Sequence, residues 1–117
     1  MKKNEKNISQ CPVSEALKII GGKWRLQIIY EIGTEKRRFG KIKRLIPEIS
    51  EKMLIQELKN LTAYGILKRK AYKEIPPRVE YSLTENGKKV LPIINQIKMF
   101  GSELIEINNA VNKTTNR

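Results

Sequence analysis

The chain has 117 residues, with 24 Lys and Arg side chains against 12 Asp and Glu, so its formal net charge is +12. This length is enough for one domain with a modest core, and the positive field attracts polyanions, nucleic acid above all. The absence of histidine removes the usual general base and metal ligand, and a single cysteine excludes both an intrachain disulfide and a cysteine-cluster metal site. We therefore expect no enzyme activity, no metal and no cofactor.

The distribution of polar and apolar residues sets the expected boundaries. Residues 1–10 and the end, NKTTNR from Asn112, are polar and lack periodicity, so we expect a flexible arm over residues 1–10 and a flexible tail over residues 109–117, on either side of one domain over residues 11–108. The charged start is not followed by an apolar run, so no secretory signal is predicted. No run of 18 apolar residues occurs, so the sequence predicts no membrane span, and the lone cysteine favours a cytoplasmic location.

Three helices are expected before residue 50. The first begins at Pro12, since proline suits a first helical turn, and ends at two glycines, residues 21–22. The second lies in KWRLQIIYEI and ends at Gly33. A short strand in RRF, residues 37–39, precedes the third, over residues 40–46, which a proline ends. The apolar positions that define the faces of these helices are Val13, Ala16, Leu17, Ile20, Trp24, Ile28, Ile32, Phe39, Ile42, Leu45 and Ile46.

A fourth helix is expected over residues 50–64. Ser50 is a suitable N-cap, and Leu54, Leu58 and Leu61 follow at the i, i+4, i+7 spacing of one buried face. A step of about 100° per residue places a polar set roughly opposite these leucines. The members of the polar set are Lys52, Gln56, Lys59 and Asn60.

After this helix the pattern changes to alternation. Two runs in ILKRKAYKEIPPRVEYSLT have a two-residue period and are separated by two prolines, residues 76–77, which predicts a β-hairpin over residues 66–83. Its tip is rich in charged side chains. Leu67, Arg69 and Ala71 are predicted to share one side of the first run. In the second run Val79, Tyr81 and Leu83 are predicted to lie opposite Glu80 and Ser82.

A last helix is expected to begin after Thr84, which is a suitable cap. Pro92 cannot donate a hydrogen bond to Lys88, so we expect a kink there. Six apolar residues recur at alternating steps of three and four, the spacing of a coiled-coil seam. This is more apolar surface than one small domain covers, so part of it is expected to meet a second copy of the chain. The seam comprises Val90, Ile93, Ile97, Phe100, Leu104 and Ile107.

The order of these elements describes a winged helix-turn-helix domain, a mostly α fold with a small β-hairpin (α+β). In that motif the helix over residues 50–64 enters the major groove of double-stranded DNA and basic groups of the wing bind phosphates. The candidate base-reading residues are Ser50, Lys52, Gln56 and Lys59, and the phosphate candidates are Lys43, Arg44, Lys68, Arg69, Lys70, Lys73 and Arg78.

The chain also resembles the HxlR-type regulators, relatives of the MarR winged-helix group. The resemblance runs from Cys11 to about Gly101 and rests on CPVSEALKIIGGKW, RRFGKIKRLIPEIS, KMLIQELKNL and GILKRKAYKEIPPRVEYSLTENGKKVLPII. It implies a bacterial, cytoplasmic and nucleoid-associated homodimeric transcription factor that binds a pseudo-palindromic operator. The first and last helices would form the dimer interface, through Val13, Leu17, Ile93, Ile97, Phe100, Leu104 and Ile107.

Cys11 is the one side chain suited to covalent chemistry. Some members of the resembled family that sense electrophiles or oxidants use a cysteine in the matching Cys-Pro position, which makes Cys11 a candidate redox sensor. Its place just before a helix N-terminus in a cationic protein also favours a lowered pKa. A packing role is the alternative. A small-molecule signal is equally open, since no residue constellation specifies an inducer.

A basic RNA- or ribosome-associated module without a specific operator is the alternative function. The charge of +12 fits it equally well. Few aromatic side chains and no RNA-motif signature such as a GXXG clamp speak against it. An enzymatic function is weaker still, because the carboxylates form no recognisable acid-base pair.

Overall fold

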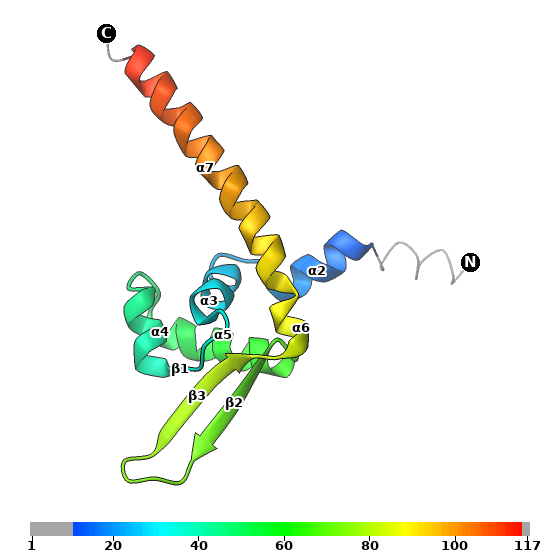
Figure 1. Cartoon of the computed structure of the whole chain (residues 1–117), viewed down its shortest axis with the longest axis vertical. Helices are drawn as coiled ribbons and strands as arrows, with labels where there is room; N and C mark the ends of the chain where they lie inside the picture. Colours follow the sequence, from blue (N-terminus) through cyan, green and yellow to red (C-terminus); the bar gives the residue numbers. More distant parts are fainter. Residues whose placement is uncertain (1–10, 116–117) are drawn as a thin grey trace, which may run out of the picture.

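The computed structural model describes residues 11–115, as a mostly helical fold with one three-stranded antiparallel sheet (Figure 1). The expected order of elements and the winged helix architecture are confirmed. The expected arm over residues 1–10 lies outside the described residues. In chain order the elements are α2 (Pro12–Ile20), α3 (Arg25–Ile32), β1 (Arg37–Arg38), α4 (Phe39–Leu45), α5 (Glu51–Ala63), β2 (Leu67–Tyr72), β3 (Arg78–Leu83), α6 (Glu85–Lys88) and α7 (Val90–Thr115).

Side-chain caps and glycines set the ends of the helices. The Ser50 hydroxyl oxygen accepts a hydrogen bond from the Met53 amide at 3.0 Å, so it caps α5 as expected. That helix ends at Ala63, and the chain then turns through Gly65, whose φ of 76° lies in the left-handed region that favours glycine. The start and the end of the expected recognition helix thus agree with the structure to within its capping residues.

The sheet has the strand order β1-β3-β2, so β3 lies between its two neighbours. Leu67 pairs with Leu83 and Arg69 pairs with Tyr81, which places the predicted alternating set on one face of the hairpin. Leu67 and Leu83 are buried at the base of the hairpin, where the sheet meets the helices. The short strand expected in RRF is present as β1, which covers Arg37 and Arg38 and pairs with β3, whereas Phe39 begins α4.

The core lies between α3, α4, α5, the base of the hairpin and the start of α7. The leucines at positions 54, 58 and 61 of α5 are buried in it, as their spacing predicts. Ile29 is fully buried as well, although the sequence pattern placed only Trp24, Ile28 and Ile32 on the face of that helix. The fully buried isoleucines are Ile28, Ile29, Ile32, Ile42, Ile46 and Ile49.

The expected single last helix is in fact two helices, with a break at Lys89. Thr84 caps α6 by accepting from the Gly87 amide at 3.0 Å, and its hydroxyl also donates to carbonyls at the base of the hairpin. Pro92 has no N–H to offer Lys88, so the first turns are not tied together by that bond. The break therefore comes earlier than the expected kink, and has the same cause.

The expected tail boundary at residue 109 is wrong as a structural limit, because α7 continues to Thr115. Residues 102–115 contain no glycine and no proline, and extending an existing helix costs far less than starting one.

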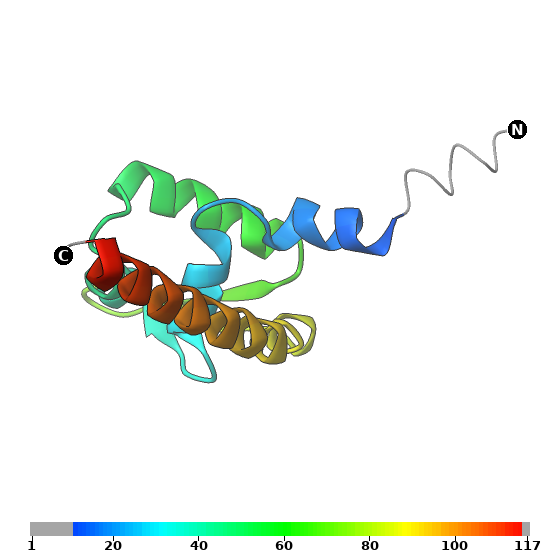
Figure 2. The same cartoon turned by 90° about the horizontal axis from the view of Figure 1, so that it is seen from above.

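Two helices project from this body. α7 leaves it as a long rod, α2 points away in another direction, and the β2–β3 hairpin extends from the opposite end (Figures 1 and 2). The radius of gyration is 18.1 Å, whereas a compact domain of this length has roughly 13 Å. In the described part of the chain, none of the helices combines the length and apolar character that crossing a bilayer requires.

Candidate nucleic-acid interface

The polar face of α5 is open. Lys52, Gln56 and Lys59 are all exposed, while the leucine face is buried beneath them. The Ser50 hydroxyl oxygen is engaged in capping, but its proton can still be donated outward. Three of the four predicted base-reading residues, Lys52, Gln56 and Lys59, therefore share one exposed side of α5, and Ser50 lies at its N-terminal end.

The hairpin carries most of the predicted phosphate ligands. Lys68, Arg69, Lys70 and Lys73 are exposed along and beyond β2. Exposed ammonium and guanidinium groups on a projecting hairpin are able to reach an anionic surface that also meets α5.

Arg78 differs from the other basic residues of the hairpin. Its guanidinium lies 2.9 Å from the Glu74 carboxylate and 3.8 Å from that of Glu80, and it stacks over the Tyr72 ring at 3.9 Å from the centroid. The side chain is 26% exposed. Arg78 thus braces the tip of the hairpin, and it is a weaker phosphate candidate than its sequence position indicates.

Two predicted phosphate ligands lie on α4. The Lys43 ammonium donates to the Pro47 carbonyl at 3.2 Å, which satisfies a carbonyl just beyond the helix. Arg44 is exposed. Of this pair, Arg44 is the freer to meet an external anion.

A groove of about 580 Å³ separates α5 from the hairpin, and it brings Lys59 and Arg69 to the same opening. Ile55 also lines it and is 44% exposed, one turn from the polar residues. Ile55 is not among the predicted base-reading residues, all of which are polar. On the helical wheel Ile55 lies about 40° from Lys59, by the step of about 100° per residue, so its place on the open face could have been predicted from the sequence.

A second basic cluster lies on the other side of the hairpin. Lys36, which precedes β1, lines a cavity of about 310 Å³ together with Lys68 and Lys70. Lys36 is not among the predicted phosphate ligands, since only the pairing of β1 with β3 brings it close to the hairpin.

The projecting helices carry large apolar side chains on their surfaces. Val13 and Leu17 of α2 are exposed, and Phe100 of α7 is 62% exposed. Chance exposure of single apolar residues is common, but a row along one helix is typical of an interface. The seam residues of α7 that are exposed are Ile93, Ile97, Phe100, Leu104 and Ile107, whereas Val90 is buried in the core.

Cys11 is the N-cap of α2 and is exposed. Hydrogen bonding from the Ser14 backbone amide, with help from the Ser14 hydroxyl and the Val13 amide, holds the pKa of the Cys11 thiol below its ordinary value. The nearby Glu15 carboxylate acts in the opposite direction, but less strongly. The thiol is therefore accessible, and its lowered pKa favours the thiolate, which is the form that oxidants attack.

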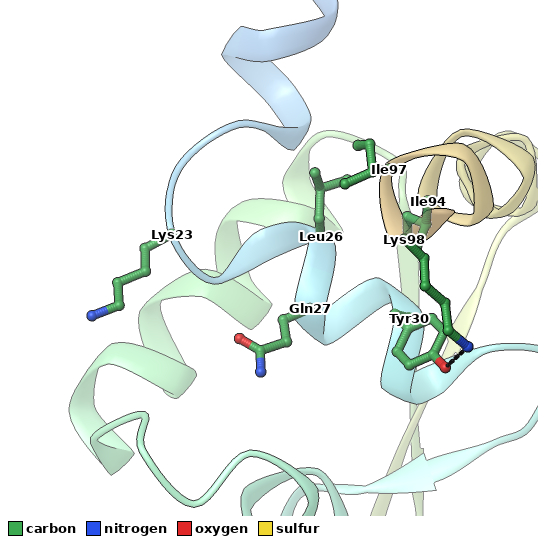
Figure 3. A pocket seen from close by; sticks show the side chains of 7 residues that line it. All are labelled: Lys23, Leu26, Gln27, Tyr30, Ile94, Ile97 and Lys98. Carbon is green, nitrogen blue, oxygen red and sulfur yellow. Dashed lines mark hydrogen bonds between the residues drawn. The ribbon is translucent and has the colours of Figure 1, made fainter. Parts of the chain in front are cut away.

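A mostly apolar cavity of about 350 Å³ lies between α3 and α7 (Figure 3). Leu26, Ile94 and Ile97 line it, and so do Lys98 and Tyr30, where the Lys98 ammonium donates to the Tyr30 hydroxyl at 3.0 Å. That bond raises the pKa of Lys98 above its ordinary value. The volume lies within the range of small-molecule sites, roughly 300–1,000 Å³, at the junction of the body and the projecting helix.

Comparison with known proteins gives consistent matches. The model of the HxlR-like helix-turn-helix family matches residues 19–109. The uncharacterized HTH-type transcriptional regulator YdeP of Bacillus subtilis is 42% identical over 93 residues, which cover 80% of this chain and 73% of YdeP.

Two solved structures show the same fold at clear sequence identity. A protein of Porphyromonas gingivalis W83 described as a MarR-family transcriptional regulator is 56% identical, with a TM-score of 0.78 over 80% of this chain and 92% of that one. The redox regulator HypR in its reduced form is 39% identical, with a TM-score of 0.79 over 86% of this chain and 99% of HypR.

Proposed function

Because the chain belongs to the HxlR-like helix-turn-helix family and is a transcriptional regulator of the HTH type, we propose that it binds a pseudo-palindromic operator as a homodimer. The observation that carries this proposal is the open polar face of α5 beside a hairpin of exposed Lys and Arg side chains. In the proposed complex, Lys52, Gln56 and Lys59 read base edges in the major groove of DNA in the cytoplasm.

The hairpin supplies the sequence-independent part of the proposed contact. Lys68, Arg69, Lys70 and Lys73 of the hairpin and Arg44 of α4 are exposed and bind phosphates. Ile55 fits the same surface, because an apolar side chain on the groove face meets the methyl group of thymine.

The exposed apolar rows of α2 and α7 support the proposed homodimer. The long rod of α7 has few neighbours in its own chain, and its seam has the spacing of a coiled coil. Two-fold pairing through this seam places two copies of α5 on one side of the dimer, where half-sites one DNA turn apart, about 34 Å, accept them.

Cys11 is proposed as the redox-responsive group. It is exposed, its pKa is lowered, and it begins the same helix that presents Val13 and Leu17 to the proposed interface. An oxidant that takes two electrons from two thiolates joins them as a disulfide, and one that modifies a single thiolate adds a polar group at this position. Either change alters the helix-to-helix packing on which operator spacing depends. The likeness to HypR, named as a redox regulator, supports this assignment.

The test is a gel shift of the purified protein on the DNA upstream of its own gene, with excess unrelated duplex as competitor, with and without a mild thiol oxidant. A specific complex that the oxidant dissociates is expected, and Cys11→Ser should bind equally well without responding to oxidant. Operator preference of roughly a thousandfold or more over bulk DNA separates a regulator from a charge-driven binder.

Other outcomes of the same experiment have defined meanings. A complex indifferent to oxidant contradicts the role of Cys11 and keeps the regulator. If the competitor removes all binding and selection from random duplexes also yields no preferred site, operator recognition is wrong and a basic RNA-binding module is the better account.

A further inference from the structure

A nearly buried ion pair links α3 to α5. The Arg25 Nε donates to both oxygens of the Glu57 carboxylate, at 3.2 and 3.3 Å. Only 15% of the Arg25 side chain and 12% of the Glu57 side chain are exposed. Glu57 stands between the buried leucine face and the open face of α5, so the ion pair holds this helix against the body of the domain.

The same arginine also holds the end of α2. Its Nη1 donates to the carbonyls of Lys18 and Ile19 at 3.1 and 3.0 Å, and its guanidinium lies 5.4 Å from the centre of the Tyr64 ring. The carbonyls are among the last of α2, which have no partner within their own helix. One side chain therefore joins the first helix to the proposed reading helix.

From Glu57 a chain of hydrogen bonds leads to the open face. The Asn60 Nδ2 donates to Glu57 Oε1 at 3.1 Å, and the Gln56 Nε2 donates to Asn60 Oδ1 at 3.2 Å. An ionised carboxylate only accepts, so Asn60 must turn its NH₂ toward Glu57 and its oxygen toward Gln56. Gln56 must then turn its own NH₂ toward Asn60. The charge of Glu57 thus determines the orientation of the Gln56 amide.

We propose that Glu57, held by Arg25 and acting through Asn60, orients the Gln56 amide so that it prefers adenine. This inference rests on the proposed operator binding. With one N–H used by Asn60, Gln56 keeps a free oxygen and one free N–H, which match the N6 amino group and N7 of adenine. Guanine offers two acceptors, O6 and N7, and meets the same free oxygen with repulsion. Glu57 and Asn60 are positioning residues, since neither needs to touch the base.

The experiment is selection of bound duplexes from a random pool by the full chain and its variants, followed by affinity measurements on single-base changes. In the wild-type site one position per half-site should prefer adenine, and Gln56→Ala should abolish that preference alone. A good bidentate pair discriminates by about 5- to 150-fold. Asn60→Ala and Glu57→Gln should reduce this ratio to about threefold or less, since each frees the amide to rotate.

The matched control is Thr62→Ala. Thr62 lies on the same helix, is also half-buried, and donates to the Leu58 carbonyl outside the chain of hydrogen bonds. It should leave every base preference unchanged. Thermal unfolding of each variant separates a lost preference from lost folding, and Asn60→Ala keeps the test decisive if Glu57→Gln fails to fold.

Three results overturn the inference. The first is an adenine preference that Asn60→Ala retains in full. The second is a Gln56-dependent position that prefers another base, or the absence of any position that depends on Gln56. The third is a wild-type protein that selects no site, which overturns the proposed function as well; the first two leave operator binding intact.

Discussion

The two arginines of the hairpin should differ in how they affect the salt dependence of DNA binding. Arg69 is exposed beside Lys59 at the groove next to α5, whereas Arg78 is held by Glu74 and Glu80 and stacks on a tyrosine ring. Arg69→Gln should therefore remove a phosphate contact. Arg78→Gln should mainly loosen the tip of the hairpin.

The size of the effect follows from counterion release. Each phosphate contact contributes about 0.9 to the slope of log K against log salt, so loss of Arg69 from both protomers lowers the slope by about 1.8. Between about 50 and 200 mM salt, the wild type should lose roughly tenfold more affinity than the Arg69→Gln dimer. Arg78→Gln should lower affinity by a factor that is nearly the same at every salt concentration, so the slope should change little.

Fluorescence anisotropy on one operator duplex across a salt series measures both slopes. Equal decreases in slope for Arg69→Gln and Arg78→Gln would refute the predicted difference, because Arg78 would then have to leave its carboxylate partners to bind phosphate. An unchanged slope for Arg69→Gln would remove this residue from the proposed interface.

Three further predictions concern the dimer, the thiol and the fold. Leu104→Asp should give monomers by analytical ultracentrifugation and weaken operator binding by about 100-fold or more, because the half-sites are no longer linked, whereas Glu106→Ser, off the seam, should stay dimeric. The lowered pKa of Cys11 means that more thiolate exists at a given pH, so iodoacetamide alkylation should reach half its maximal rate at a lower pH than for an unstructured cysteine peptide; a midpoint at or above that of the peptide contradicts the assignment. Gly87→Ala should cost about 1–3 kcal/mol in urea unfolding, because its Cβ would meet a carbonyl at the base of the hairpin. Gly101→Ala, where a Cβ meets open space, should instead raise the free energy of unfolding by about 0.5–1 kcal/mol. Equal changes in this free energy for the two variants would show that the backbone at Gly87 does not lie tightly against that carbonyl.

Local periodicity was sufficient to predict most of the fold. The leucines of α5 and the alternation in the hairpin each report a face directly, because the geometry of a helix or strand repeats within a few residues. The start of α5 could be predicted for the same reason, because Ser50 is its N-cap. Features that depend on two or three neighbouring turns are thus accessible from the sequence.

What could not be predicted depends on partners far along the chain. In the sequence, Glu57 does not differ from the other polar residues of α5. Its burial is explained only by the ion pair with Arg25, which is 32 residues away. Arg78 counts as a basic residue of the hairpin until the structure places Glu74, Glu80 and an aromatic ring around it. Charge identity is visible in a sequence, but the distance between charges is not.

The break at Lys89 and the long continuous α7 fix the direction in which the outer part of the seam faces relative to the rest of the molecule. Thr84 ties the start of α6 to the hairpin, and residues 102–112 of α7 are exposed along their whole length. Each residue of a helix turns the next by about 100°, so inserting one residue after Gly101 would rotate the outer seam by that angle relative to α5. Inserting seven residues would restore the original orientation of the outer seam to within about 20°. The outer helix is therefore a part that protein engineering can exchange for another pairing helix, provided that its register is kept.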